Sequence, residues 1–179
     1  TIIKVYFTSN NVGFACSDSG RIMKTIDGGE TWVLKPTNTL RGFTYLSFIN
    51  ANQGYAVASG GFVFKTNDAG ETWDSISTGE PDVSRAIWFL NEDTGFVAGT
   101  NKIARTFDGG NTWNIHTSLI ASSIQDIVFT NASLGYCAGT FGKILFTTDA
   151  GLNWSQTNNN SNNAAIEEMW FANDSVGYF

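Results

Sequence analysis

Four aspartates at regular spacing are the residues whose type and pattern first suggest chemistry. Asp27, Asp68, Asp108 and Asp149 each sit in a segment of the form Thr-x-Asp-x-Gly-x-Thr/Asn-Trp, which recurs every 40 or 41 residues. Carboxylates serve as general acids, as bases and as cation ligands. Here, however, threonine and glycine stand at fixed offsets around each aspartate, which is typical of a tight turn whose backbone N–H groups the carboxylate accepts. We therefore expect these aspartates to brace turns and not to catalyse.

Each repeated segment contributes a threonine, an aspartate, a glycine and a tryptophan to the expected scaffold. In chain order these structural positions are Thr25, Asp27, Gly29, Trp32, Thr66, Asp68, Gly70, Trp73, Thr106, Asp108, Gly110, Trp113, Thr147, Asp149, Gly151 and Trp154. Self-similarity with a period of about 20 to 50 residues indicates a propeller, a solenoid or another array. We expect each tryptophan to fill the gap between one sheet and the next.

The elements that position these turns are short strands. A phenylalanine followed six residues later by Gly-Phe or Gly-Tyr precedes each segment, at Phe7, Phe48, Phe89 and Phe129, and occurs once more at Phe171. Alternating apolar residues and turn signals then divide the first repeat into strands at Ile2 to Thr8, Gly13 to Ser17, Arg21 to Ile26 and Thr31 to Lys35. The longest helix candidate, Asn163 to Met169, is better explained as a loop that leads into a strand.

This pattern predicts an all-β fold, a β-propeller of four-stranded antiparallel blades. The sequence holds four blades and the first strand of a fifth, in one domain with expected blades at residues 1–39, 40–80, 81–121, 122–163 and, in part, 164–179. Because a fifth inner strand has begun, we expect a complete ring of about six to eight blades, with the rest outside this sequence. Blade edges left open at both ends would invite pairing.

Composition excludes several classes of function. The net charge is −6 and the Lys and Arg residues are scattered, so the chain offers no basic surface for nucleic acid. No apolar run approaches the roughly 18 residues of a membrane span.

Cys16 and Cys137 lie three repeats apart, and we expect small buried thiols and no disulfide. The sequence starts and ends inside strand-like runs, which suggests a mature segment or a piece of a longer protein.

Catalytic constellations are missing from the sequence. His116 is the single histidine and has no histidine or cysteine at ligand spacing, so we expect neither a metal nor another cofactor. A serine nucleophile lacks its base for the same reason. The Gly-Gly pairs lie in turns with no helix after them to hold a phosphate. A sialidase would need an arginine cluster, and the arginines are dispersed, at Arg21, Arg41, Arg85 and Arg105.

The positions three and four before each recurring phenylalanine differ in every repeat, unlike the scaffold positions. Such variation is typical of a shared recognition surface to which each blade contributes a different group, although a solvated channel rim would explain it equally well. We expect this surface on the top face, built from the links between blades and the turns after the second strands. The predicted binding residues are Lys4, Tyr45, Arg85, Gln125, Asp126, Glu167 and Glu168. Asp126 with Glu167 or Glu168 is also the candidate acid pair of a hydrolase.

The repeated segment resembles the Asp-box, or BNR, repeat. With the preceding Gly-Phe or Gly-Tyr, the whole unit resembles the propeller family of photosystem II stability and assembly factors, over the full chain. That family has relatives among secreted bacterial proteins that often end in a secretion-sorting domain. In related propellers, such as sortilin-type receptors, sialidases and glucan hydrolases, the box is structural and faces away from the ligand, which implies a structural role for the four aspartates. Departures are Asn153 in place of threonine and Asn101 where other repeats carry glycine.

These observations leave three functions open. The first is a non-enzymatic bacterial propeller, secreted, on the cell surface or in the periplasm, that binds a protein or a polymer such as a polysaccharide through its top face. The second is a polysaccharide-active glycoside hydrolase whose catalytic carboxylates lie partly on blades outside this sequence. The third is a cargo bound to bacterial secretion machinery of the type IX kind, since an acidic, Asn-rich, Lys-poor composition fits an exported protein.

Overall fold

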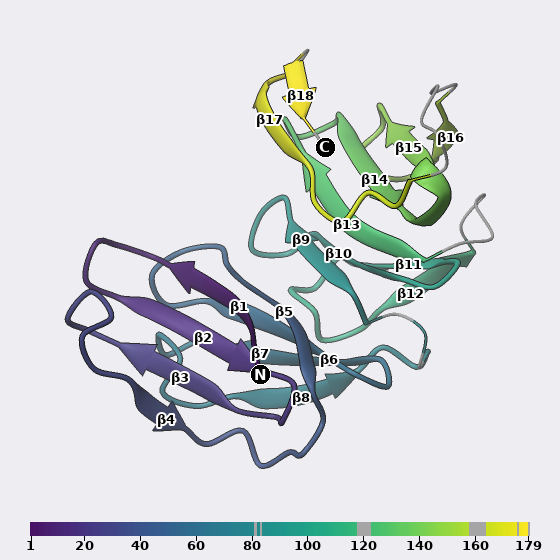
Figure 1. The fold of residues 1–179 in the computed structure, drawn as a ribbon. Coiled ribbons are helices and arrows are strands. Elements are labelled where there is room, and N and C mark those ends of the chain that lie inside the picture. The colour runs from purple at the N-terminus through teal and green to yellow at the C-terminus, as the bar shows by residue number, and fades with distance from the viewer. Residues whose placement is uncertain (81, 83, 118–122, 158–163, 175, 179) are drawn as a thin grey trace. The chain divides into compact units, whose positions relative to one another are not determined.

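The computed structural model describes residues 1–179 apart from 81, 83, 118–122, 158–163, 175 and 179. The described residues form four antiparallel four-stranded sheets and one two-stranded sheet (Figure 1). Among these residues, one 3₁₀ turn, η1 (Thr140–Gly142), connects the second and third strands of the fourth sheet. Among the described residues, no helix has the length and apolar character needed to cross a membrane. The expected links at residues 81, 118–122 and 158–163 lie outside the described residues.

In every four-stranded sheet the strands lie in chain order, with each strand next to the one that follows it. The first two sheets are β1 (Ile2–Phe7), β2 (Gly13–Ser17), β3 (Ile22–Thr25) and β4 (Val33–Lys35), then β5 (Phe43–Phe48), β6 (Gly54–Ala58), β7 (Phe62–Thr66) and β8 (Asp74–Ser77). The third and fourth are β9 (Ala86–Phe89), β10 (Gly95–Gly99), β11 (Lys102–Thr106) and β12 (Asn114–Thr117), then β13 (Ile124–Phe129), β14 (Gly135–Gly139), β15 (Ile144–Thr147) and β16 (Ser155–Gln156).

The fifth sheet contains one strand more than we expected. β17 (Trp170–Asn173) pairs with β18 (Val176–Tyr178), whereas the sequence predicted only the first strand of this blade. The chain divides into two compact units, Thr1–Ile87 and Trp88–Phe179. The first two sheets belong to the first unit, and the fourth and fifth sheets belong to the second.

The recurring phenylalanine and glycine are partners across the first two strands of each sheet. Phe7 lies opposite Gly13, and Phe48 lies opposite Gly54. The ring rests on the glycine, so that a Cβ atom added there would lie 2.5 to 2.6 Å from a ring carbon; this holds for Gly13, Gly54, Gly95, Gly135 and Gly177. Real Cβ atoms do not approach this closely, and only glycine therefore fits beneath the ring.

Neighbouring sheets of a unit pack through the aromatic residue that follows this glycine. In the first unit Phe14 stacks on Phe48 of the next sheet, with ring centroids 4.1 Å apart. Phe14, Cys16 and Ile22 of the first sheet share one buried core with side chains of the second sheet. Equivalent stacks in the second unit join Phe96 to Phe129 at 4.9 Å and Tyr136 to Phe171 at 4.6 Å.

The tryptophans share the gap between sheets with the stacked aromatic pairs. Trp73 meets Phe48 of its own sheet edge-on at 6.0 Å, and Trp32 meets Phe7 in the same way at 6.2 Å. Trp154 also reaches the preceding sheet, where Phe96 lies 6.4 Å away. In each stacked pair, the ring on the second strand of one sheet lies over the recurring phenylalanine of the next sheet. The tryptophan packs edge-on against that phenylalanine.

The two cysteines are free and buried, as expected. Burial raises the pKa of the Cys16 thiol to about 11 and that of Cys137 well above its ordinary value. Both thiols therefore stay protonated near neutral pH and behave as small apolar side chains.

Candidate functional site

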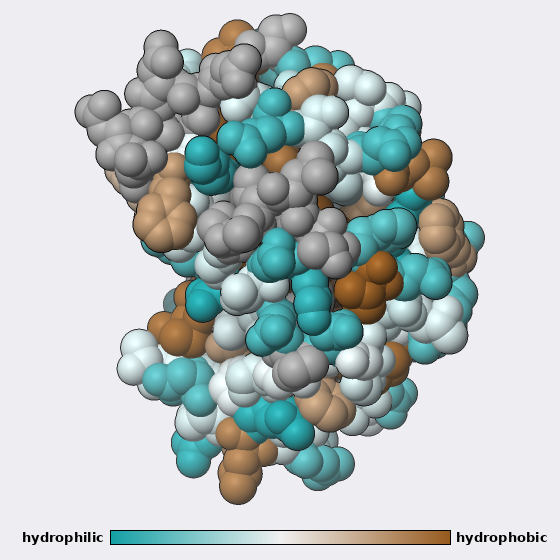
Figure 2. Space-filling model, turned by 90° about the vertical axis from the view of Figure 1, so that its right-hand side faces the viewer, coloured by the Kyte–Doolittle hydropathy of each residue, from teal (hydrophilic) through white to brown (hydrophobic). Residues whose placement is uncertain are grey.

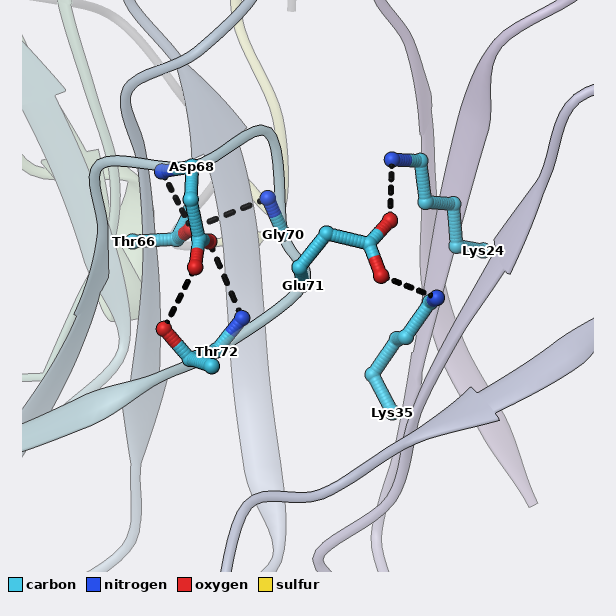
Figure 3. Close-up of polar contacts among 7 residues, drawn as sticks. All are labelled: Lys24, Lys35, Thr66, Asp68, Gly70, Glu71 and Thr72. Atoms are coloured by element: carbon cyan, nitrogen blue, oxygen red, sulfur yellow. Dashed lines mark hydrogen bonds and ion pairs between the residues drawn. The ribbon is translucent and has the colours of Figure 1, made fainter.

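The four aspartates hold the turns between the third and fourth strands. In the second sheet, Asp68 Oδ1 accepts the Thr72 N–H at 2.9 Å, and Asp68 Oδ2 accepts the Thr72 hydroxyl at 2.6 Å (Figure 3). The Thr66 hydroxyl donates to Asp68 Oδ1 at 2.8 Å and accepts the Gly70 N–H at 2.9 Å. The same arrangement recurs around Asp27, Asp108 and Asp149.

These hydrogen bonds keep the turn aspartates ionised. The Thr72 hydroxyl is the largest cause that lowers the pKa of Asp68 to about 2, and the Thr112 hydroxyl acts in the same way on Asp108. At Asp149 the backbone N–H of Asn153 is the main cause, and the pKa again falls to about 2. The Asn153 amide donates to Asp149 Oδ2 at 2.8 Å and so replaces the missing threonine hydroxyl. Carboxylates saturated by their own turn are structural groups.

The aspartate turns lie at the opposite end of each sheet from the predicted binding positions. The Gly28 N–H, in the first aspartate turn, donates to the Asn11 carbonyl in the turn between β1 and β2 at 2.9 Å. At the other end, the Ser59 N–H, after β6, donates to the Gly42 carbonyl just before β5 at 2.9 Å. The start of each first strand therefore lies away from the carboxylates.

The variable positions coincide with a β-bulge at the start of the first strand. The pairing register shifts between Ile2 and Lys4, and equivalent shifts occur around residues 44 and 125. A bulge adds an unpaired residue, bends the strand and redirects its side chains, and bulges are over-represented beside functional sites. The bulged residues are Ile3, Thr44 and Gln125.

In the first unit, the structure brings two predicted residues into contact. The Lys4 ammonium lies 4.8 Å from the centroid of the Tyr45 ring, a cation–π contact. The Thr44 hydroxyl donates to the Ser84 carbonyl at 2.7 Å and holds the segment that leads to Arg85 beside β5. Arg85 itself is exposed. Lys4, Tyr45 and Arg85 therefore lie on neighbouring segments at the inner strands of the first unit.

In the second unit, Asp126 is placed differently from the other predicted residues. Its side chain is 4% exposed; Oδ1 accepts the Ile127 N–H at 2.9 Å, and Oδ2 accepts the Met169 N–H at 2.8 Å. Asp126 thus fastens the segment before β17 to β13. Glu167 and Glu168 are exposed and Gln125 is partly exposed, so these three residues are the ones within reach of a ligand.

Sequence reasoning missed a groove of about 360 Å³ in the second unit. The inner strands β9, β13 and β17 line it, with Trp88, Val128, Met169 and Trp170 among its walls. Its volume is within the range of about 300 to 1,000 Å³ of small-ligand pockets. The signal in the sequence was a tryptophan directly before the recurring phenylalanine, at Trp88 and Trp170.

In the part of the chain that the structure describes, no three His, Cys, Asp or Glu side chains lie close enough together to hold an ion. The single histidine, His116, lies on β12 and is exposed.

A carboxylate of the second aspartate turn clamps the first two sheets together. Glu71 Oε1 lies 2.7 Å from the Lys24 ammonium, and Glu71 Oε2 lies 2.6 Å from the Lys35 ammonium (Figure 3). The lysine side chains are 11% and 16% exposed, whereas that of Glu71 is 52% exposed. Their hydrogen bonds, that of Lys24 first, lower the pKa of Glu71.

We expect Glu71→Gln to lower the free energy of unfolding of the first unit by about 0.5 to 1 kcal/mol, because each half-exposed ion pair contributes little. Urea denaturation at low and high salt measures this loss, which should shrink as salt rises. Glu30 holds the same position in the first turn and is exposed, so Glu30→Gln is the matched control. Equal losses in the two variants would contradict a clamp.

Repeated antiparallel four-stranded sheets, joined by aspartate turns and packed through recurring aromatic stacks, define a BNR-type β-propeller segment. The sequence matches the family described as photosynthesis system II assembly factor YCF48 over residues 1–81 and 80–162. The chain belongs to this family. A comparison with curated proteins found no match.

Two kinds of solved structure are similar to the chain. YCF48 bound to D1 peptide is 16% identical, with a TM-score of 0.54, and the match covers 99% of this chain and 89% of that one. YCF48 from Cyanidioschyzon merolae is 13% identical, with a TM-score of 0.54 and coverages of 98% and 91%. An ancestral GH74 enzyme is 17% identical, with a TM-score of 0.75, and the match covers 89% of this chain but only 24% of the enzyme. At these identities the likeness establishes the β-propeller fold.

Proposed function

We propose that this chain is part of a non-enzymatic propeller that binds a segment of a partner protein at the inner-strand ends of its blades. The recurring bulge carries the proposal, because it presents residues that differ from sheet to sheet at one end of otherwise repeated strands. Variable groups on a rigid scaffold are typical of binding surfaces. The YCF48 of one similar structure is bound to D1 peptide, which supports a protein partner.

The groove of the second unit supports an extended peptide as the ligand. Trp88 and Trp170 offer apolar walls for a side chain of the partner. The exposed carboxylates of Glu167 and Glu168 directly precede Met169, which lines the groove, and they favour a basic residue at that end.

A glycoside hydrolase is the second candidate, because GH74 enzymes share the fold. Hydrolysis of a glycosidic bond requires two carboxyl groups on either side of the substrate. Asp126, one member of the pair that the sequence suggested, is buried and accepts two backbone N–H groups. This arrangement weighs against the enzyme and leaves Glu167 and Glu168 as the acidic residues to test.

The experiment is a selection of displayed peptides, D1 peptide among them, on the immobilised chain. The wild type is expected to enrich a consensus sequence, and a triple variant, Arg85→Ala, Gln125→Ala and Glu167→Ala, is expected to lose the enrichment with little change in melting temperature. The control triple variant changes exposed residues at the aspartate-turn end, by Glu30→Ala, Asn67→Ala and Thr148→Ala.

Two results would argue against this function. If the binding-face triple variant enriched the same peptides as the wild type, the bulge positions would not be the site. If the chain released sugar from xyloglucan or another glucan, and Glu168→Gln abolished the release, the hydrolase would replace the binding module.

A further inference from the structure

Arg105 is a buried cation whose hydrogen-bond donors lack an acceptor. It lies on β11 and is 6% exposed, and its Nε and Nη1 atoms are buried without a hydrogen-bond partner. Burial lowers the pKa of Arg105, and the charge of Asp149 opposes this effect. The Asp149 carboxylate itself accepts hydrogen bonds from its own turn. A guanidinium stays charged in proteins, and buried N–H groups without an acceptor destabilise a fold. These groups therefore lack an acceptor that the described part of the chain does not supply.

Arg105 faces the gap between the third and fourth sheets, within the second unit. It lies opposite Phe96 across β10 and β11, so the two side chains share one face of the sheet. Its Cζ atom is 5.3 Å from the centroid of the Phe96 ring, and that ring stacks on Phe129 of the fourth sheet at 4.9 Å. Both sheets that border this gap are in the chain, so the gap is not an open end of the propeller.

The first unit shows what such a cation binds. Lys24 holds the position of Arg105 in the first sheet, and its ammonium likewise lies over a ring of β2, 5.7 Å from the centroid of Phe14. The Lys24 ammonium donates to Glu71 Oε1, from the turn of the second sheet, at 2.7 Å. In Figure 3 this carboxylate points toward the lysines and away from Asp68 of the same turn. A carboxylate therefore fits this place although a turn aspartate is near.

The second unit lacks the corresponding carboxylate. Leu152 holds the position of Glu71 in the fourth aspartate turn and is 60% exposed. His116 holds the position of Lys35, the second lysine that Glu71 binds, and is exposed. An arginine and a histidine thus replace the two lysines of the clamp, while an apolar side chain replaces its acid.

An exposed aromatic ring covers the guanidinium. Phe107, directly after β11, is 54% exposed, and its ring centroid lies 4.2 Å from Arg105 Cζ. On the face of the molecule drawn in Figure 2, exposed apolar side chains lie singly or in small groups among polar ones, so an exposed ring alone marks no site. Phe107 differs because it lies over a buried cation, and a rotation of its ring toward solvent uncovers that cation.

We propose that Arg105 binds the carboxylate of an acidic side chain of a partner protein, which takes the place that Glu71 occupies in the first unit, with the Phe107 ring rotated aside. A planar guanidinium matches a carboxylate through two parallel N–H bonds. The Phe107 ring offers apolar surface to a neighbour of that side chain, which a free small acid lacks. The site lies on an outer strand and takes an acidic segment, whereas the groove lies on inner strands and favours a basic residue.

Nuclear magnetic resonance of the 19.4 kDa chain tests this site. The probe is a blocked pentapeptide with a glutamate between a phenylalanine and a leucine. The Nε–Hε signal of Arg105, assigned by its loss in Arg105→Met, should shift when this peptide is added. Arg105→Met should weaken the binding, followed on backbone amides, by at least about tenfold, because hydrogen bonds to charged groups are strong. The same peptide with glutamine in place of glutamate should not shift the signal.

Two substitutions of the exposed Leu152 form a matched pair. Leu152→Glu places a carboxylate where the second turn carries Glu71, so it should raise the melting temperature and weaken peptide binding by at least about tenfold. Leu152→Gln has nearly the same size without the charge and should bind the peptide like the wild type. Because Leu152 is exposed, both variants are expected to fold even if Arg105→Met does not, and circular dichroism checks this.

Three results would overturn the proposal. An Arg105 signal that the glutamate peptide leaves unchanged would exclude the site. Equal peptide affinity of Leu152→Glu and the wild type would show that the peptide binds elsewhere. If glutarate or inorganic phosphate bound the wild type as tightly as the peptide, the ligand would be a free anion and not a protein segment.

Discussion

Phe48→Ala is expected to lower the free energy of unfolding of the first unit by about 3 to 5 kcal/mol, the usual range for a buried phenylalanine. Phe48 is 6% exposed and lies at the centre of the packing between the first two sheets. Its ring stacks on Phe14 at 4.1 Å and meets Trp73 edge-on at 6.0 Å. Alanine would leave a cavity that neighbouring rings cannot fill, since each is already held by its own strand.

Phe7→Ala is the matched control for this prediction, because Phe7 holds the same position in the first sheet and is 44% exposed. Its loss should be less than half as large, because a side chain that is already partly exposed leaves a smaller cavity when it is removed. Urea denaturation of both variants measures the difference. Similar losses for Phe48→Ala and Phe7→Ala would mean that the stack on Phe14 does not stabilise the unit.

The second large effect is a loss of stability in acid. The pKa values of Asp68, Asp108 and Asp149 are lowered from 3.8 to about 2 in the folded chain, and that of Asp27 is also lowered. A group whose pKa is lower in the folded state stabilises the fold above its unfolded pKa, and this stabilisation disappears as the pH falls toward the folded pKa. We therefore expect stability to fall steeply between about pH 4 and pH 2, with an uptake on unfolding of up to about one proton per turn aspartate.

The slope of unfolding free energy against pH measures this proton uptake. Asp68→Asn should reduce it by up to about one proton, and Thr72→Val should reduce it by less, because it removes only the hydroxyl that lowers the pKa of Asp68 most. Leu152→Ala is the control, since the exposed Leu152 side chain lies in the fourth turn and holds no hydrogen bond to its aspartate. An unchanged slope in both turn variants would mean that the aspartates do not hold the turns as anions.

The fold was predictable because each repeated residue has a local task. Glycine must lie beneath Phe7 and its counterparts, and the aspartate needs its threonines only a few residues away. Asn101 also fits this account, because it adopts a φ of 57° where Gly20 and Gly61 adopt 75° and 73°. Asparagine tolerates this left-handed conformation better than most residues.

The candidate site was less predictable because it depends on contacts between sheets. The position of Asp126 in its repeat predicted an exposed ligand group, but its carboxylate accepts the Met169 N–H from 43 residues further along the chain. The aromatic groove likewise forms only where Trp88, Val128 and Trp170 come together from separate repeats. The repeat pattern predicts which residues are equivalent, but it does not predict which of the residues that differ between repeats meet in the folded chain.

In the proposed function, partner segments bind at the starts of the inner strands and along the groove, away from the aspartate turns. Hydrogen exchange of the chain with and without a selected peptide tests this location, because a bound segment slows exchange of the amides that it covers. We predict slower exchange at residues 43–47, 84–88, 123–128 and 164–171, with no change at the turns around Asp27, Asp68, Asp108 and Asp149. Protection confined to those turns would contradict the account.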